Sequence, residues 1–309
     1  MAAALILAGV ALLYLGGELL VQNAVRLARG LGTSPLVVGL TVVAFGTSAP
    51  ELAASLAAAI GGAPEVAYGN VVGSNAANLG LVLALAALLR PVPARARFLR
   101  RELPFMAAGT GLLIAVAADG RVSRIEGGFL LLLLFFYLFV LLRDREPPEV
   151  EAEFAGEYPS AGGRVGGRLL LVAFGVLLLT LGAHALVAGA VAGARALGVG
   201  ERFLGLSVVA VGTGLPELAA ALVAARRGEG DVLLGNLVGS NVFNLLGVLG
   251  AVALVRPLSL AGPPGPELWG LVALSLVAWR FLWTGMRLGR REGAALLAGY
   301  LAWLVAAHG

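Results

Sequence analysis

The sequence predicts an all-α integral membrane protein of ten transmembrane helices, arranged as two inverted five-helix repeats with broken helices at a shared site. Of its 309 residues, 59% are hydrophobic and only 13% are charged, and the mean hydropathy is +0.93. Soluble domains are roughly a quarter charged. No charge interrupts residues 129–142 or 169–183, and about 20 mostly apolar residues cross a bilayer. The expected environment of the chain is therefore the lipid bilayer.

The two halves of the chain repeat one another. Residues 46–56 (GTSAPELAASL) and 212–222 (GTGLPELAAAL) are identical at eight of eleven positions. Residues 69–80 (GNVVGSNAANLG) and 235–246 (GNLVGSNVFNLL) are identical at eight of twelve. Both pairs are separated by 166 residues. Because nothing is inserted or deleted between the motifs, the halves are expected to share one backbone plan.

Apolar stretches place five helices in each half. They are expected near residues 2–25, 34–60, 65–89, 101–118 and 124–142, and again near 168–194, 201–225, 231–255, 266–284 and 293–308. The first repeat then takes residues 1–142 and the second takes residues 168–309. Residues 143–167 between them are charged and rich in Pro and Gly, which is typical of a linker.

An odd number of helices in each repeat makes the second repeat enter the membrane from the opposite side. The basic residues agree, because 17 of the 22 arginines fall on the linker side of the predicted helices and 5 on the other. The positive-inside rule then predicts a multi-pass protein of the cell (plasma) membrane with a cytoplasmic linker and both termini outside. This distribution accounts for the pI of about 10.1 without a nucleic-acid partner.

Three acidic residues lie within predicted helices: Glu18, Glu51 and Glu217. A carboxylate in hydrocarbon costs roughly 2.5–3.5 kcal/mol on insertion scales, so a functional role is its default explanation. Glu51 and Glu217 are repeat equivalents. Glu18 aligns with His184 under the same offset. That pair is either a gate or proton-sensitive latch, or two polar residues that face a wet crevice.

The first repeated motif, Gly-Thr-x-x-Pro-Glu-Leu, surrounds both Glu51 and Glu217. Proline removes a backbone donor and frees the carbonyl four residues before it. Freed carbonyls, the hydroxyls of Thr47 and Thr213, and the two carboxylates together offer hard oxygen ligands. Ca²⁺ takes six to eight oxygens, and Na⁺ accepts the same chemistry. Inverted-repeat transporters build midplane ion sites from such broken helices.

The second motif, Gly-Asn-x-Val-Gly-Ser-Asn-x-x-Asn, supplies further candidate ligands. Its serine and last asparagine are four residues apart, which places them on one helical face; these are Ser74 and Asn78, and Ser240 and Asn244. Its glycines are expected to let helices approach closely: Gly69, Gly73, Gly235 and Gly239. Its other asparagines are expected to tie helices together: Asn70, Asn75, Asn236 and Asn241.

These doubled motifs resemble the two alpha-repeats of the cation/calcium antiporter superfamily, and within it those of prokaryotic sodium/calcium exchangers. The resemblance covers essentially the whole chain. It implies ion ligands on the second, third, seventh and eighth helices, where the first and sixth helices slide past the rest. The implied ligands are Thr47, Ser48, Glu51, Ser74, Asn78, Thr213, Glu217, Ser240 and Asn244, joined by the backbone oxygens of Ala44 and Ala210.

Two residues depart from the pattern of prokaryotic sodium/calcium exchangers. Those proteins commonly carry a serine where this chain has Gly214, and an aspartate where it has Asn244. The missing hydroxyl is expected to weaken one site for a monovalent ion. The missing aspartate leaves a centre with only two formal carboxylates. Ion selectivity and stoichiometry therefore do not carry over directly from the family.

The predicted function is exchange of Ca²⁺ for Na⁺ by alternating access, without a cofactor. Glu51 and Glu217 together carry a charge of −2, which one Ca²⁺ or two Na⁺ neutralise. An empty site exposes two like charges in low dielectric, so only loaded states are expected to interconvert easily. H⁺/Ca²⁺ exchange is the alternative, because protons compete for the same glutamates. The Ser- and Thr-rich motif favours Na⁺.

An intramembrane enzyme is a further alternative, which the residue content disfavours. The chain has no cysteine, which excludes disulfides, thiol catalysis and zinc–thiolate sites. It has no HExxH motif, and His184 is the only histidine within the predicted apolar part of a helix. The sequence identifies no protein partner, so Ca²⁺, Na⁺ or H⁺, and lipid are the expected interactions.

Overall fold

The computed structural model describes residues 1–143, 165–196, 212–260, 262–263 and 265–308. The first, fourth and fifth predicted helices are α1 (Ala2–Gly30), α7 (Ala96–Val116) and α8 (Arg124–Arg143). The second is divided into α2 (Pro35–Val38), the π-helix η1 (Gly39–Val43), α3 (Ala44–Thr47) and α4 (Ala49–Ile60). The third is divided into α5 (Pro64–Ala77), the π-helix η2 (Asn78–Val82) and α6 (Leu83–Leu89). In the second half, the predicted helices are α10 (Val165–Ala196), α12 (Leu215–Arg227), α15 (Pro266–Gly285) and α16 (Arg290–His308). The eighth predicted helix is divided into α13 (Gly230–Val242), the π-helix η3 (Phe243–Val248) and α14 (Leu249–Val255).

The described residues place helical segments at every predicted position, with some differences at their ends. Six helices are long and apolar enough to cross a membrane, and a seventh is counted if residues 35–47 and 49–60, bent by 42°, form one span. The helix predicted from residue 101 instead begins at Ala96, so its first turns carry Arg97 and Arg100, which precede the predicted helix. Most of the predicted linker, residues 143–167, lies outside the described residues.

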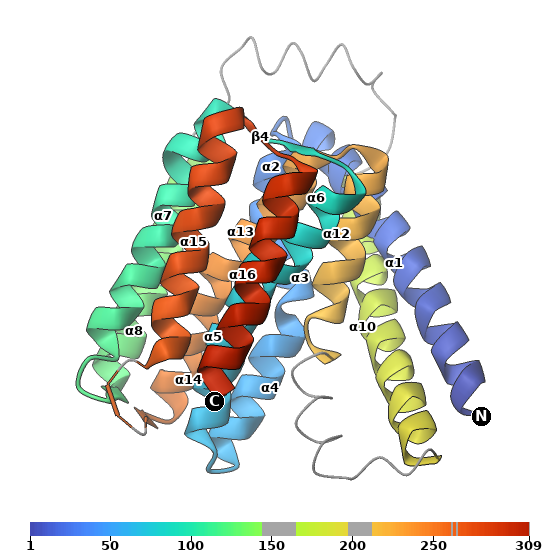
Figure 1. The fold of residues 1–309 in the computed structure, drawn as a ribbon. Coiled ribbons are helices and arrows are strands. Elements are labelled where there is room, and N and C mark those ends of the chain that lie inside the picture. The colour runs from blue at the N-terminus through green and yellow to red at the C-terminus, as the bar shows by residue number, and fades with distance from the viewer. Residues whose placement is uncertain (144–164, 197–211, 261, 264, 309) are drawn as a thin grey trace.

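Helices α1 and α10 pack against each other backbone to backbone, side by side on one flank of the molecule (Figure 1). A Cβ at Gly16 would lie 2.8 Å from Leu179 N, and a Cβ at Gly182 would lie 2.8 Å from Leu13 N. Glycine is therefore required at both positions, which are equivalent under the 166-residue offset. This contact between α1 and α10 joins the first helix of one repeat to the first helix of the other.

The remaining helices form a body around α13, in which every residue from Val232 to Val242 is buried. The predicted close approach is found at Gly235 and Gly239, where an added Cβ would lie 2.6 Å from the carbonyl oxygens of Leu36 and Leu40. Among the described residues, nothing lies within 4 Å of a Cβ at Gly69 or Gly73. Their expected partner by symmetry, near residues 201–209, lies outside the described residues.

Two short antiparallel sheets show that the repeats are inverted. The strands β1 (Val92–Pro93) and β4 (Arg287–Leu288) pair with each other, as do β2 (Arg121–Val122) and β3 (Leu258–Ser259). Adding 166 to the residue numbers of β1 gives β3, and adding it to β2 gives β4. The two sheets are therefore symmetry mates. Both termini lie at the end of the molecule opposite to β4 (Figure 1).

The outer surface is apolar where a bilayer would contact it. Helix α8 exposes Phe135, Phe136 and Phe139, and α10 exposes Leu170 and Phe174. Such a surface would be an aggregation hazard in water, whereas hydrocarbon chains are as apolar as these side chains. The structure is therefore that of an all-α, multi-pass integral membrane protein.

Candidate ion-binding site

Two helices of the body begin at the centre of the site rather than at its edge. Helix α3 ends at Thr47, Ser48 breaks the helix, and α4 begins at Ala49 with Pro50 in its first turn. In the second repeat, α12 begins at Leu215 with Pro216 next to it, after Gly214 at the N-cap. Proline suits the first turn because its missing N–H would have no partner there.

Each of these two helices carries its glutamate in the first turn. Glu51 is 2% exposed and Glu217 is 1% exposed. The positive end of a helix dipole stabilises a negative charge at that position. The break in each helix therefore places a carboxylate at the centre of the site, at the positive end of a helix dipole.

The carboxylates face the hydroxyl groups of the opposite repeat. Ser48 Oγ lies 3.5 Å from Glu217 Oε1, and the hydroxyl of Thr47 also lies near this carboxylate. The hydroxyl of Thr213 lies near the carboxylate of Glu51. The two glutamates are close enough for their charges to interact. The second oxygen of each, Oε2, is buried without a hydrogen-bond partner among the described residues.

Thr47 lies at the junction of the two repeats. It is fully buried, and its Oγ1 lies 3.1 Å from Asn236 Oδ1, 3.4 Å from Ser240 Oγ and 3.4 Å from the carbonyl oxygen of Ala44. Three neutral oxygens from α3 and α13 thus lie within hydrogen-bonding distance of this hydroxyl. Such oxygens are the ligand type that Ca²⁺ and Na⁺ share.

The remaining predicted ligands lie on the π-helical segments and beside them. Asn78 begins η2 and Asn244 lies in η3. These segments occupy equivalent positions in the two repeats, and π-bulges are frequent at functional sites. Asn244 is 1% exposed and its Oδ1 has no hydrogen-bond partner among the described residues. Ser74 is half-buried on α5.

The structure therefore brings together the core of the predicted ligand set by hydrogen bonds or close approach: Ala44, Thr47, Ser48, Glu51, Thr213, Glu217 and Ser240. Within the described part of the chain, no hydrogen bond joins Ser74, Asn78 or Asn244 to this group. Ala210 lies outside the described residues. Among the described residues, no group of three or more His, Cys, Asp or Glu side chains is placed to hold a metal ion.

This geometry agrees with the comparisons with known proteins. The sodium/calcium exchanger protein family matches residues 1–143 and 168–308. The chain belongs to this family. The inner membrane protein YrbG of Escherichia coli is 34% identical, with 98% of this chain and 96% of YrbG covered. The sodium/calcium exchanger MaX1 of Methanosarcina acetivorans is 33% identical, with 97% of each chain covered.

Solved structures support the same assignment. The sodium-calcium exchanger NCX_Mj, soaked with Na⁺ and Ca²⁺, matches with a TM-score of 0.86 at 31% identity, and the match covers 100% of this chain and 99% of that chain. The resemblance stated from the motifs is thereby confirmed. As a member of the exchanger family, the chain is a multi-pass membrane transporter, and the family gives no support to the alternative of an intramembrane enzyme.

Three of the four other asparagines in the second motif join helices of this exchanger, as the sequence predicted. Asn236 holds Thr47, while Asn70 Nδ2 donates to Ser55 Oγ at 2.9 Å and to the carbonyl oxygen of Glu51 at 3.3 Å. Asn241 joins α13 to α5 and η2. The expected role as ties between helices is confirmed for these three. It is wrong for Asn75, whose amide donates to Val71 O in its own helix.

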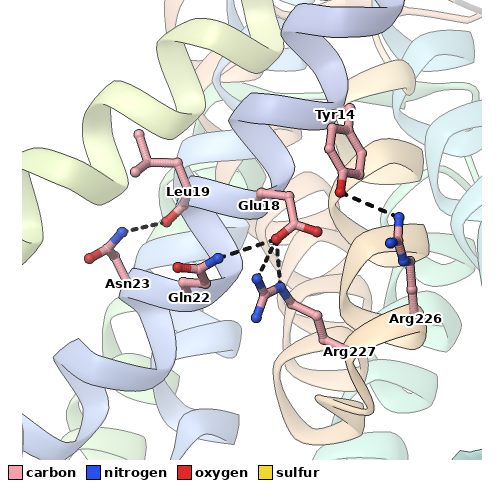
Figure 2. Close-up of polar contacts among 7 residues, drawn as sticks. All are labelled: Tyr14, Glu18, Leu19, Gln22, Asn23, Arg226 and Arg227. Atoms are coloured by element: carbon pink, nitrogen blue, oxygen red, sulfur yellow. Dashed lines mark hydrogen bonds and ion pairs between the residues drawn. The ribbon is translucent and has the colours of Figure 1, made fainter.

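Glu18 and His184, aligned by the repeat, do not pair with each other. Figure 2 shows Glu18 of α1 bound instead to Arg227 at the end of α12, with Arg227 Nε 2.7 Å from Glu18 Oε2 and Gln22 donating to the same oxygen. Arg226 beside it donates to Tyr14 Oη at 3.3 Å. His184 is exposed and contacts Thr180 O within α10. Glu18 therefore joins α1 to the body of the molecule.

Proposed function

We propose that this exchanger moves Ca²⁺ against Na⁺ by alternating access at the site between Glu51 and Glu217. The proposed ligands are the residues predicted from the motifs: Ala44, Thr47, Ser48, Glu51, Ser74, Asn78, Ala210, Thr213, Glu217, Ser240 and Asn244. Family membership supports cation exchange, and the names of MaX1 and NCX_Mj as sodium/calcium exchangers support these two ions.

The observation that carries the proposal is the pair of buried carboxylates with unpartnered oxygens. Glu51 Oε2 and Glu217 Oε2 have no hydrogen-bond donor among the described residues. A buried charged group without a partner costs several kcal/mol, so a cation is the natural occupant of the space between them. One Ca²⁺ or two Na⁺ would balance the charge of −2. Exchange is then obligatory, because changing access with an empty site would keep two like charges buried without a counter-ion, which costs free energy.

Gly214 is the observation that favours H⁺ as the coupling ion instead. Ser48 provides a hydroxyl beside Glu217, whereas Gly214 at the equivalent position provides none beside Glu51. One site for a monovalent ion therefore has fewer neutral oxygens, whereas a proton needs only the carboxylate. The other hydroxyls, from Thr47, Thr213 and Ser240, support Na⁺ coupling.

The deciding experiment separates the two driving ions. Purified protein in liposomes is loaded with Na⁺ or with acid, and ⁴⁵Ca²⁺ uptake is measured with only one gradient applied at a time. Na⁺ coupling predicts uptake under an outward Na⁺ gradient at equal pH, and none under an outward H⁺ gradient without Na⁺. Uptake under the H⁺ gradient alone would replace the proposal with H⁺/Ca²⁺ exchange.

The proposed organisation in the membrane follows from the arginine distribution. Residues 1–142 and 168–309 form the two repeats, the linker of residues 143–167 lies in the cytoplasm, and both termini lie outside. The asymmetry of 17 arginines against 5 supports this orientation. A location in the cell membrane is supported by the name of the relative YrbG as an inner membrane protein.

A further inference from the structure

Asn241, which is absent from the proposed ligand set, contacts the proposed ligand Asn78 directly. Asn78 Nδ2 donates to Asn241 Oδ1 at 3.0 Å, and both side chains are buried, at 3% and 1% exposed. Asn241 is itself held from two sides. Its Nδ2 lies 3.4 Å from the carbonyl oxygen of Asn75 on α5 and 3.6 Å from Met106 Sδ on α7. The amide of Asn241 thus lies where α13, α5 and α7 meet.

This contact decides which end of the Asn78 amide is available to an ion. A carboxamide presents an oxygen acceptor at one end and two N–H donors at the other. The bond to Asn241 occupies the donor end of Asn78, so Oδ1 points away from Asn241. Within the described part of the chain, Oδ1 of Asn78 receives no hydrogen bond. If the amide were turned around, its N–H groups would face the cation and repel it.

The second repeat lacks this arrangement. The equivalent of Asn241 is Asn75, whose Nδ2 donates to Val71 O at 2.6 Å within its own helix. The Oδ1 atoms of Asn75 and Asn244 are both buried without a hydrogen-bond partner among the described residues. The amide of Asn244 is therefore not oriented by Asn75, and the two halves of the site differ although their motifs are the same.

We propose that Asn241 is a positioning residue for the transported cation, which fixes the amide of Asn78 so that its oxygen faces the ion. The inference rests on the proposed role of Asn78 as a ligand. Groups that hold ligands in place commonly change metal affinity by about 10- to 100-fold when they are removed. Asn241 is expected to act on the affinity for the cation rather than on the rate of helix movement. It contacts the proposed ligand Asn78 and does not lie on α1 or α10, the helices expected to slide.

The test compares Asn241→Leu with Asn75→Leu, the matched variant at the equivalent position. Initial rates of ⁴⁵Ca²⁺ exchange are measured in liposomes over a range of Ca²⁺ concentrations. Asn241→Leu is expected to raise the half-maximal Ca²⁺ concentration at least about tenfold with a maximal rate within about twofold of the parent. Asn75→Leu should change the half-maximal concentration less than about twofold, because its bond orients no ligand.

Two double variants show whether the effect passes through Asn78. In an Asn78→Leu background, Asn241→Leu should add no further loss of affinity. In an Asn78→Asp background, Asn241→Leu should raise the half-maximal Ca²⁺ concentration less than about twofold, because both ends of a carboxylate are oxygens and need no orientation. If Asn241→Leu does not assemble, Asn241→Thr serves in its place. Its hydroxyl is one bond shorter than the amide and does not reach Asn78.

The outcomes separate this inference from the proposed function. A parent protein without Ca²⁺ flux would overturn the proposed function, and the inference with it. Parent flux with an unchanged half-maximal concentration in Asn241→Leu would overturn the inference alone. Independent, multiplying effects of Asn241→Leu and Asn78→Leu would do the same, because they would show that Asn241 contributes only to general stability.

Discussion

At the scale of single residues, charge and neutral oxygen have separate roles in the proposed site. Glu51 and Glu217 provide the charge, and each is buried with one unpartnered oxygen. We expect Glu51→Gln and Glu217→Gln each to reduce Ca²⁺ exchange to the level of protein-free liposomes, because an amide keeps the shape and loses the charge. The control is Glu65→Gln, at an exposed glutamate in the first turn of α5, which should exchange normally. Normal flux in either site variant would disprove the assignment.

The residue Gly214 allows the role of a neutral oxygen to be tested alone. It is the N-cap of α12, as Ser48 is of α4, and nothing among the described residues lies within 4 Å of an added Cβ. Gly214→Ser should lower the half-maximal Na⁺ concentration by roughly two- to tenfold, the factor for a contact of about 0.5–1.5 kcal/mol. Gly214→Ala is the control, because it fills the same space without an oxygen. Equal Na⁺ dependence in both variants would contradict the prediction.

The residue Asn244 allows an added charge to be tested. Its Oδ1 is buried and unpartnered, on a π-helical segment equivalent to that of Asn78. With two carboxylates, a site loaded with Ca²⁺ is neutral, and a third carboxylate would add a group that binds either a proton or an ion. We expect Asn244→Asp mainly to make Ca²⁺ flux more dependent on pH, measured as Na⁺-driven flux across a pH series. A profile that overlays the parent would show that position 244 does not face the ions.

At the scale of helices, two arginines cap the half-helices that carry the glutamates. Arg256 Nη1 donates to the carbonyl oxygens of Ala59 and Ile60 at the end of α4, both at 3.1 Å. Arg90 Nη1 donates to the carbonyl oxygen of Arg226 at the end of α12. These contacts are equivalent under the 166-residue offset, and each joins one repeat to the other. A cation at a helix C-terminus satisfies free carbonyls and opposes the dipole.

We expect Arg256→Gln to destabilise the protein, because it leaves the end of α4 with a neutral cap. The cost should be about 1 kcal/mol, since the arginine is exposed and screened. The expected decrease in Tm in detergent is a few degrees. Arg256→Lys, which keeps the charge, should fall between the parent and Arg256→Gln. Arg124→Gln, at an exposed arginine on α8, should leave Tm unchanged. Equal Tm values for Arg256→Gln and Arg124→Gln would contradict the capping role.

These helices also show what the sequence could and could not predict. Pro50 and Pro216 predicted that the helices carrying the two glutamates are broken, because proline acts locally along the chain. The caps by Arg90 and Arg256 carry no local signal, since they depend on contacts between residues some 136 to 197 positions apart. The bond between Asn78 and Asn241 was missed for the same reason. The repeat predicted that Asn75 and Asn241 occupy equivalent helices. It did not predict that Asn241 bonds to Asn78 while Asn75 bonds within its own helix.

At the scale of the whole molecule, the inversion of the repeats sets which loops share a face. The sheet of β1 and β4 and the sheet of β2 and β3 are symmetry mates. Asp119 next to β2 and Gly262 after β3 therefore belong to one end of the molecule, and Thr284 before β4 belongs to the other. The arginine distribution predicts a cytoplasmic linker, so Thr284 is expected in the cytoplasm and Asp119 and Gly262 outside.

Single cysteines can test this orientation cleanly, because the chain has no cysteine of its own. We expect Glu151→Cys and Thr284→Cys to react with a membrane-impermeant maleimide only after the cell membrane is opened. Asp119→Cys and Gly262→Cys should react in intact cells. Their loops follow the fourth and the eighth predicted helix, and an even number of crossings from an outside N-terminus returns the chain to the outside. The four variants form two pairs, so a single unreactive position does not decide the result. Labelling of Glu151→Cys and Gly262→Cys from the same face would contradict the topology. Reversal of both pairs together would keep the inverted repeats and overturn only the cytoplasmic placement of the linker.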